Sequence, residues 1–108
     1  MFLKGMLVHA CKSCGSHLTA KRFLISKDYR GKYGKAHLYK KAVNILEGKR
    51  EKRSMTTGVH IIKELKCAIC EKYVGWKYIV AYEKDQKFKE GKFILEKTLF
   101  KKLDKSIE

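Results

Sequence analysis

Four cysteines, arranged as two C-x-x-C pairs, are the residues best suited to chemistry in this chain. They are Cys11 with Cys14 and Cys67 with Cys70. Two residues between thiols let one tight turn direct both sulfurs at a single ion, while backbone N–H groups bond the thiolates. Two such pairs supply four thiolates, which complete the tetrahedral shell of Zn²⁺ and leave no open position. The spacing therefore predicts one structural zinc ion.

Two other uses of paired cysteines compete with zinc. A thioredoxin-like dithiol normally opens a helix inside a βαβ unit, and neither pair does so. Disulfides require an oxidising compartment, but residues 1–8 are interrupted by Lys4 and lack the long apolar region of a signal peptide. We expect a reducing location, in the nucleus or the cytoplasm, and zinc is favoured over both alternatives.

The two pairs stand much farther apart in sequence than the ~15–20 residues of an ordinary zinc ribbon. The metal is therefore expected to join the N-terminal segment to a strand end in the second half of the chain. Gly15 follows the first pair and suits a left-handed turn. Glu71 holds that place after the second pair, so the second turn is expected to close differently.

A zinc shell of four cysteines leaves no thiol to act as a nucleophile. The histidines form no H-E-x-x-H pair and no readable Ser-His-Asp arrangement; they are His9, His17, His37 and His60. We therefore expect the protein not to be an enzyme.

The elements that must position the cysteines are predicted to be short β-strands. Proline is absent, and the eight glycines stand where turns are wanted. Strand patterns cover 23–26, 36–46, 52–57, a stretch from Val59 toward Cys67, 76–82 and 92–99, with a hairpin tip at 48–51. Along 76–82, Trp76, Tyr78, Val80 and Tyr82 alternate on one face. The sequence thus predicts an all-β fold.

The length of 108 residues suits one domain, with a core over about 8–100 and a basic tail or frayed helix at 101–108. Hydrophobic residues make up 44% of the chain, enough for a packed core. Apolar stretches fall far short of the ~18 residues of a membrane span, so no membrane association is expected.

The chain carries a formal charge of +15, from 26 Lys and Arg against 11 Asp and Glu. Nearly all the cations are lysines spread along the chain, which favours non-specific phosphate binding over base reading. One tight run offers a candidate phosphate-binding or nuclear-import patch, although a solvated hairpin tip is the favoured interpretation. It comprises Lys49, Arg50, Lys52 and Arg53.

A spaced pattern of residues resembles the Yippee family of small zinc-binding proteins. Its most specific part is Cys67-Ala68-Ile69-Cys70, then Gly75-Trp76-Lys77-Tyr78, then Lys89 to Glu96. The pattern also includes Cys11, Cys14, Gly34, Leu38, Asn44 and Gly58. The resemblance implies a β-tent, two antiparallel sheets that meet at an angle and are held by a Cys₄ zinc. Its wider group looks related to type B methionine sulfoxide reductases, whose catalytic cysteine outside the zinc site has no counterpart here.

The same group includes the ligand-binding domain of cereblon, which cages a cyclic imide with aromatic rings. Trp76 and Tyr78 match two cage positions, but Ile62 and Thr56 stand where two tryptophans are expected. The resemblance therefore implies a reduced pocket, with His60 a rim candidate or a hydrogen-bonding residue of the fold. A core aromatic packed against the zinc turn is the favoured interpretation of Trp76.

Three function classes follow from these observations. The resemblance implies a non-enzymatic regulatory adaptor that binds a protein partner, such as subunits of a GID/CTLH-type E3 ubiquitin ligase. The lysine excess suggests a nucleic-acid-binding module as an alternative. A sensor of a small ligand or peptide, using Trp76 and Tyr78, is the other.

Overall fold

The computed structural model describes residue 3 and residues 5–105, and this part of the chain is built from strands and short 3₁₀ turns. The strands are β1 (Leu7–Cys11), β2 (His17–Ala20), β3 (Leu24–Gly31), β4 (Gly34–Tyr39), β5 (Ile45–Met55), β6 (Gly58–Cys67), β7 (Tyr73–Ala81), β8 (Phe93–Glu96) and β9 (Phe100–Lys105). The 3₁₀ turns are η1 (Lys21–Phe23), η2 (Lys84–Lys89) and η3 (Lys97–Leu99). The all-β prediction is confirmed. None of the described helices has the length and apolarity needed to cross a membrane.

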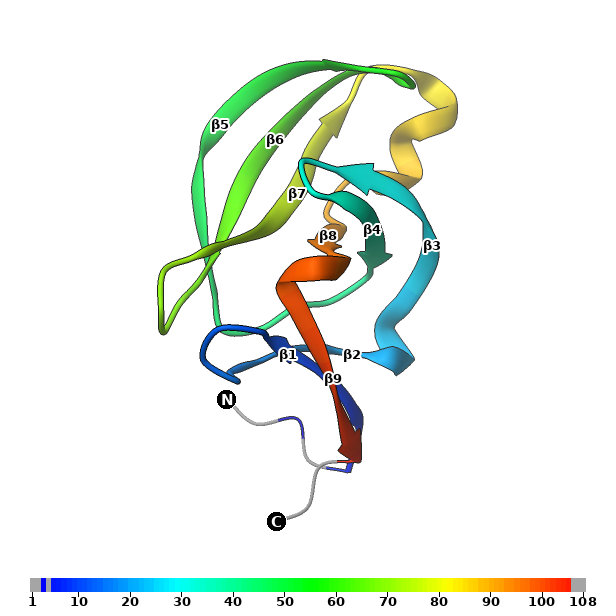
Figure 1. Cartoon of the computed structure of the whole chain (residues 1–108). Helices are drawn as coiled ribbons and strands as arrows, with labels where there is room; N and C mark the ends of the chain where they lie inside the picture. The colour runs from blue at the N-terminus through cyan, green and yellow to red at the C-terminus, as the bar shows by residue number, and fades with distance from the viewer. Residues whose placement is uncertain (1–2, 4, 106–108) are drawn as a thin grey trace.

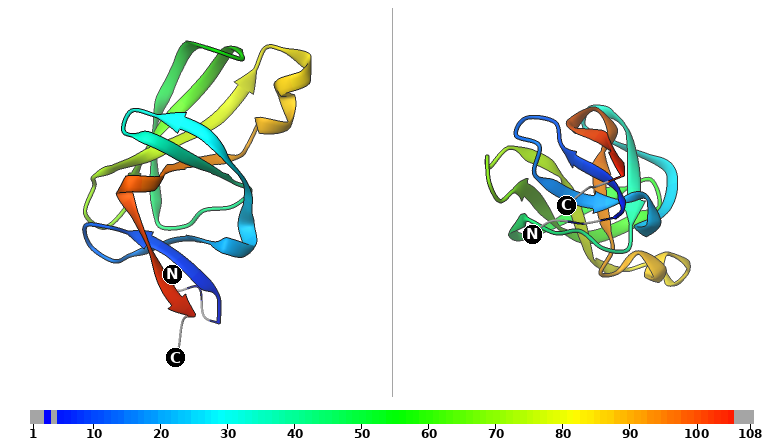
Figure 2. Two further views of the ribbon diagram at one scale, coloured as in Figure 1. Left: turned by 45° about the vertical axis from the view of Figure 1, so that its right-hand side comes forward. Right: turned by 90° about the horizontal axis from the view of Figure 1, so that it is seen from below.

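Two antiparallel sheets form the molecule, as the resemblance implied. The small sheet has the order β2-β1-β9, and the large sheet the order β3-β4-β8-β7-β6-β5. The long strands β5, β6 and β7 curve over one end of the molecule, and the small sheet lies at the opposite end (Figure 1). Figure 2 shows the small sheet set at an angle to the large one. Residues near both ends of the chain thus meet in one sheet, because β1 pairs with β9.

The predicted hairpin tip at 48–51 is wrong. Strand β5 continues through this stretch, with a bulge between Glu47 and Arg50, and pairs with β6 along its length. The true tip is Thr56–Thr57, where Met55 pairs with Gly58. A glycine at 48 therefore marks a bulge rather than a reversal, since one extra residue can be absorbed in a strand without ending its pairing.

Two further strand boundaries differ from the sequence prediction. The stretch expected at 36–46 ends as a strand at Tyr39, and residues 40–44 connect β4 to β5, which begins at Ile45. The expected tail at 101–105 is instead most of β9, with Lys101 paired to Ala10 and Lys105 to Leu7. An unpaired edge of β1 provides this partner, which the lysine-rich sequence does not reveal.

The predicted alternation along β7 holds only for its first half. Trp76 and Tyr78 are buried, whereas Tyr82 lies beyond the strand and is 52% exposed. Ala81 takes the buried position instead of Val80. The cause is a bulge in β7 itself: Ile61 pairs with Val80 and the next residue, Ile62, pairs with Tyr78, so Ile79 is an extra residue. One extra residue exchanges the two faces of the strand that contains it.

The core consists of separate hydrophobic clusters, and the position of Trp76 differs from its favoured interpretation. One cluster contains Cys11 and Cys67 and packs between the two sheets; its other buried members are Leu18, Tyr39, Leu65, Val74, Leu95 and Phe100. Trp76 belongs to another cluster, with Tyr78, Ile62, Ile94, Ala36 and Leu38. The indole therefore does not pack against the zinc turns.

Candidate functional site

The four cysteine sulfurs come together at one place between the sheets. Their Sγ atoms all lie within 4.8 Å of one another, with 3.6 Å between Cys11 and Cys70 and 3.5 Å between Cys14 and Cys67. A tetrahedral zinc ion with Zn–S bonds of about 2.3 Å holds its sulfurs about 3.8 Å apart. The donor set and its spacing therefore fit a closed Cys₄ zinc site.

Both C-x-x-C turns close with the same hydrogen bonds, contrary to the prediction that the second would differ. In the first turn, Gly15 N–H donates to Cys11 O at 2.8 Å with φ +79°. In the second, Glu71 N–H donates to Cys67 O at 2.8 Å with φ +62°. A glutamate in the left-handed region costs roughly 1–2 kcal/mol. Glu71 accepts this conformation because the turn must direct both sulfurs at the common centre.

The surroundings of the sulfurs differ in polarity. Burial raises the pKa of the Cys11 thiol to about 12, so this sulfur needs a nearby cation to ionise at neutral pH. The exposed Cys14 has the opposite shift, because hydrogen bonding to the Ser16 hydroxyl, 3.1 Å away, lowers the pKa of Cys14 to about 6. A divalent metal would supply the charge that the buried side of the cluster lacks.

The cluster joins the two sheets at the ends of strands distant in sequence. Cys11 ends β1 of the small sheet and Cys67 ends β6 of the large sheet. Each turn is also fastened to a neighbouring segment, because Lys12 N–H donates to Leu99 O and Ala68 N–H donates to Asn44 O. The geometry thus agrees with a metal that connects the two halves of the chain.

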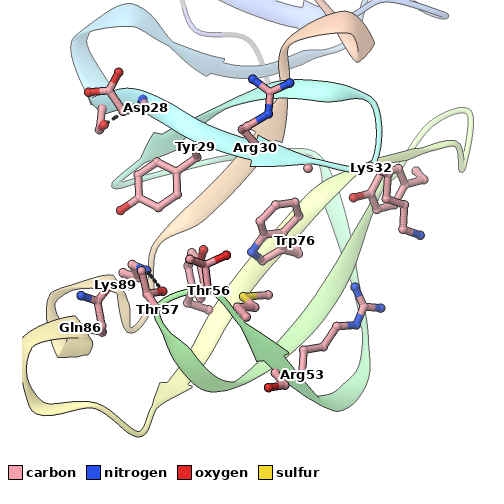
Figure 3. A pocket seen from close by; sticks show the side chains of 16 residues that line it. Asp28, Tyr29, Arg30, Lys32, Arg53, Thr56, Thr57, Trp76, Gln86 and Lys89 are labelled. Atoms are coloured by element: carbon pink, nitrogen blue, oxygen red, sulfur yellow. Dashed lines mark hydrogen bonds between the residues drawn. The ribbon is translucent and has the colours of Figure 1, made fainter.

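A pocket of about 860 Å³ opens on the large sheet (Figure 3). Its walls come from β3, the end of β5 with the Thr56–Thr57 turn, β7 and the 3₁₀ turn η2. Among the predicted pocket residues, Trp76, Tyr78 and Thr56 line it. The size lies within the range typical of small-molecule sites.

The other two predicted pocket residues lie outside the lining. Ile62 is fully buried in the cluster that supports Trp76. His60 is also fully buried; its Nδ1 lies 2.9 Å from Gly58 O and its ring centroid lies 5.1 Å from that of Tyr78. His60 therefore supports Tyr78 from behind and hydrogen-bonds within the fold rather than forming the pocket rim.

Sequence reasoning missed Lys89, which η2 places in the pocket wall with only 3% of its surface exposed. Its Nζ donates to Thr57 Oγ1 at 2.9 Å and lies over the rings of Tyr29 and Tyr78. The sequence contained one indication that Lys89 is special, because Lys89 belongs to the pattern of residues that resembles the Yippee family. That pattern assigned it no role.

Glu96 stands in the same pattern, and it fixes one wall of the pocket. This fully buried carboxylate accepts hydrogen bonds from the backbone N–H groups of Lys32 and Tyr33 and from the Tyr73 hydroxyl at 2.6 Å. Burial and this carboxylate raise the pKa of Tyr73, which keeps the hydroxyl a donor. The turn between β3 and β4 is thereby tied to β7 and β8, and β3 carries Tyr29 into the pocket.

The predicted phosphate patch lies along β5 and is partly engaged by acids and rings. Arg53 pairs with Glu51 at 2.9 Å and Glu64 at 3.0 Å, and Lys52 lies over the Tyr82 ring. Lys49 and Arg50 are exposed.

Another group of cations surrounds a hollow of about 410 Å³ beside the buried His37. It comprises Lys27, Arg30, Lys35, Lys97 and Lys102.

Two antiparallel sheets with four clustered thiols define a small all-β protein with a site suited to zinc. A family model described as Yippee zinc-binding/DNA-binding and Mis18, centromere assembly, matches residues 7–105. The chain belongs to this Yippee/Mis18 family. The zinc-binding family and the four-cysteine cluster together indicate one Zn²⁺.

Individual relatives agree with this membership. A yippee-like protein of Solanum tuberosum is 46% identical over 90 residues, which cover 83% of this chain and 70% of that protein. One from Arabidopsis thaliana is 41% identical over 100 residues, covering 93% and 94% of the two chains. The crystal structure of a Mis18 "Yippee-like" domain has a TM-score of 0.72 at 14% identity, covering 92% of this chain and 96% of that one. This last likeness shows the fold alone.

Proposed function

We propose that the protein is a non-enzymatic adaptor, a zinc-bound β-sheet scaffold that docks a partner or ligand at the Trp76 pocket. The observation that carries this proposal is the open pocket, lined by aromatic rings and held in place by a buried carboxylate, on the sheet that the cysteine cluster joins to its neighbour. The four-cysteine shell leaves no coordination position for a substrate, which supports a binding role over catalysis.

The finer assignment is a subunit or modulator of a GID/CTLH-type E3 ubiquitin ligase, acting in the nucleus or the cytoplasm. Membership in the Yippee/Mis18 family supports this assignment, because the resemblance to the Yippee family implies an adaptor that binds subunits of such a ligase. A reducing compartment also suits thiolates that must remain available to a metal.

Copurification from the source cells is the test of the adaptor role. Tagged wild-type protein is expected to bring down scaffold subunits of the ligase, identified by mass spectrometry. Thr56→Glu, which puts a charge at the exposed mouth of the pocket, is expected to reduce their recovery at least about 10-fold. Ile69→Ser is the control, because Ile69 is 68% exposed on the second cysteine turn and does not line the pocket.

Two outcomes contradict different parts of this proposal. If ligase subunits never accompany the wild-type protein, the assignment to that complex fails. If they accompany the Thr56→Glu variant as well as the wild type, docking at the pocket fails.

Nucleic-acid binding is a second candidate, favoured by the cations around His37. Desolvation, followed by the charges of Lys27, Lys97, Lys102 and Lys35, lowers the pKa of His37, and the contributions of the lysines agree with a positive potential there. Labelled duplex DNA and single-stranded RNA should bind at low ionic strength, with affinity falling steeply as salt rises.

Substitutions can locate such a surface. Lys97→Gln with Lys102→Gln should lower both the affinity and the salt dependence, whereas Lys49→Gln with Lys52→Gln should change them less. The reverse ranking favours the β5 patch, and no binding even at low salt removes this candidate.

A further inference from the structure

Lys89 is a buried cation without an anionic partner. Its exposed fraction is 3%, and none of the described side chains forms an ion pair with it. Its Nζ donates one hydrogen bond to Thr57 and lies over two rings, 5.4 Å from the centroid of Tyr29 and 5.2 Å from that of Tyr78. An ammonium group usually needs a paired charge when it is buried, so this arrangement calls for an anion from outside.

The neighbouring groups cannot supply that charge. Burial raises the pKa of Tyr78 to about 12 and also raises that of Tyr29, so both phenols are neutral at physiological pH. Asp85, the acid that most affects Lys89, is exposed and does not line the pocket. Asp28 is an acid in the lining, but it is exposed and lies on β3, where Arg30 also lines the pocket.

A second buried donor faces the same space. The indole Nε1 of Trp76 is buried and has no partner in hydrogen-bond geometry among the described residues, although the indole is close enough to the Tyr78 hydroxyl to oppose in part the rise of the Tyr78 pKa. The Tyr78 ring lies 6.2 Å from the Trp76 ring and 5.2 Å from Lys89 Nζ, so one ring adjoins both donors. Figure 3 shows Trp76 and Lys89 both at the cavity.

We propose that the pocket binds a ligand that carries a carboxylate on an apolar or aromatic body, with Lys89 and Trp76 Nε1 as the donors to the carboxylate. A carboxylate matches one buried ammonium with one negative charge, whereas a phosphate monoester carries about −1.5 to −2. The other cations of the lining are less suited to balance a second charge, because Lys32 and Arg53 are paired with Glu64 and Arg30 is exposed. The rings of Tyr29 and Tyr78 and the side chain of Met55 then contact the apolar body. The inference rests on the proposed role of this pocket as a docking site.

The carboxylate can come from a free small acid or from the C-terminus of a peptide, and one experiment separates these sources. Trp76 is the single tryptophan, so its emission reports directly on the pocket. The zinc-loaded protein is titrated with 3-phenylpropionate, 3-phenylpropionamide and phenyl phosphate, then with acetyl-Ala-Phe as the free acid and as the C-terminal amide. Tighter binding of the peptide acid than of 3-phenylpropionate identifies a C-terminus, and the reverse identifies a small acid.

The acids are expected to change the Trp76 emission and to bind about 10- to 100-fold more tightly than the amides, the range that a charge-assisted hydrogen bond provides. Lys89→Met should remove this preference, while Lys89→Arg should keep it because the charge remains. Lys84→Met is the matched control, since Lys84 is an exposed lysine on the same η2 turn. Melting curves and zinc content of each variant establish that it is folded.

Four results overturn the inference. They are equal binding of acids and amides, acid binding undiminished in a folded Lys89→Met protein, tighter binding of phenyl phosphate than of 3-phenylpropionate, and no change in emission with any acid at millimolar concentration. Equal binding of acids and amides would contradict the preference for a carboxylate but would leave the pocket as a docking site. Failure of this inference is therefore distinguishable from failure of the adaptor proposal.

Discussion

Removal of the metal is expected to abolish the cooperative folding of this protein. The cysteine cluster joins the end of β1 in the small sheet to the end of β6 in the large sheet, and two of its cysteines belong to the hydrophobic cluster packed between the sheets. Binding of a structural zinc ion contributes on the order of 10 kcal/mol or more, comparable to the whole stability of about 5–15 kcal/mol of a small domain. A chelator should therefore convert a sharp thermal transition into a shallow one at much lower temperature.

Single substitutions at the first cysteine turn separate metal loss from other damage. Cys14 is exposed, so Cys14→Ala removes one ligand without leaving a cavity in the core. It should lower the zinc content below one per chain and the melting temperature by tens of degrees. Ser13→Ala is the control, because Ser13 is exposed in the same turn and bears no thiol. Elemental analysis without stoichiometric metal in gently purified protein, or a melting curve unaffected by chelators, would contradict the zinc assignment.

Gly75→Ala is expected to be the most damaging exchange of a single hydrogen for a methyl group. A Cβ at residue 75 would lie 1.8 Å from the carbonyl oxygen of Ile94 and 2.8 Å from its carbon. Both are backbone atoms of β8, the central strand that joins β4 to β7, so no side chain can move aside. We expect a loss of about 3 kcal/mol or more in the free energy of unfolding, measured by urea denaturation of the zinc-loaded protein.

Gly91→Ala tests whether lost space, rather than lost backbone freedom, causes this effect. Beyond residues 90–92, no atom lies within 4 Å of a Cβ at residue 91, but φ is +79°. The strain of a left-handed alanine should cost about 1–2 kcal/mol, less than the overlap at Gly75. Equal losses in the two variants would show that β7 and β8 can separate without cost, contrary to their pairing.

The local sequence determined the metal ligands and the strand content. A C-x-x-C turn is a property of a few consecutive residues, so two such turns predict a four-sulfur site wherever the chain brings them together. The period-2 pattern at Trp76 and Tyr78 likewise predicted which face of β7 is buried, because alternation is built into a strand. The resemblance carried the prediction further, to two antiparallel sheets.

Long-range pairing decided what the local pattern could not. Whether Gly48 ends a strand depends on β6 opposite it, and whether Lys101–Lys105 is a tail depends on the open edge of β1. Glu71 adopts a glycine-like conformation because four sulfurs must converge, which outweighs its own preference.

Lys89 shows most clearly what only tertiary structure decides. A lysine in a lysine-rich chain is indistinguishable by sequence from its exposed neighbours. Burial of this one follows from the meeting of η2, β3, β7 and the Thr56–Thr57 turn around it. Burial is a property of all the surfaces that surround a side chain, and those surfaces come from segments far apart in sequence.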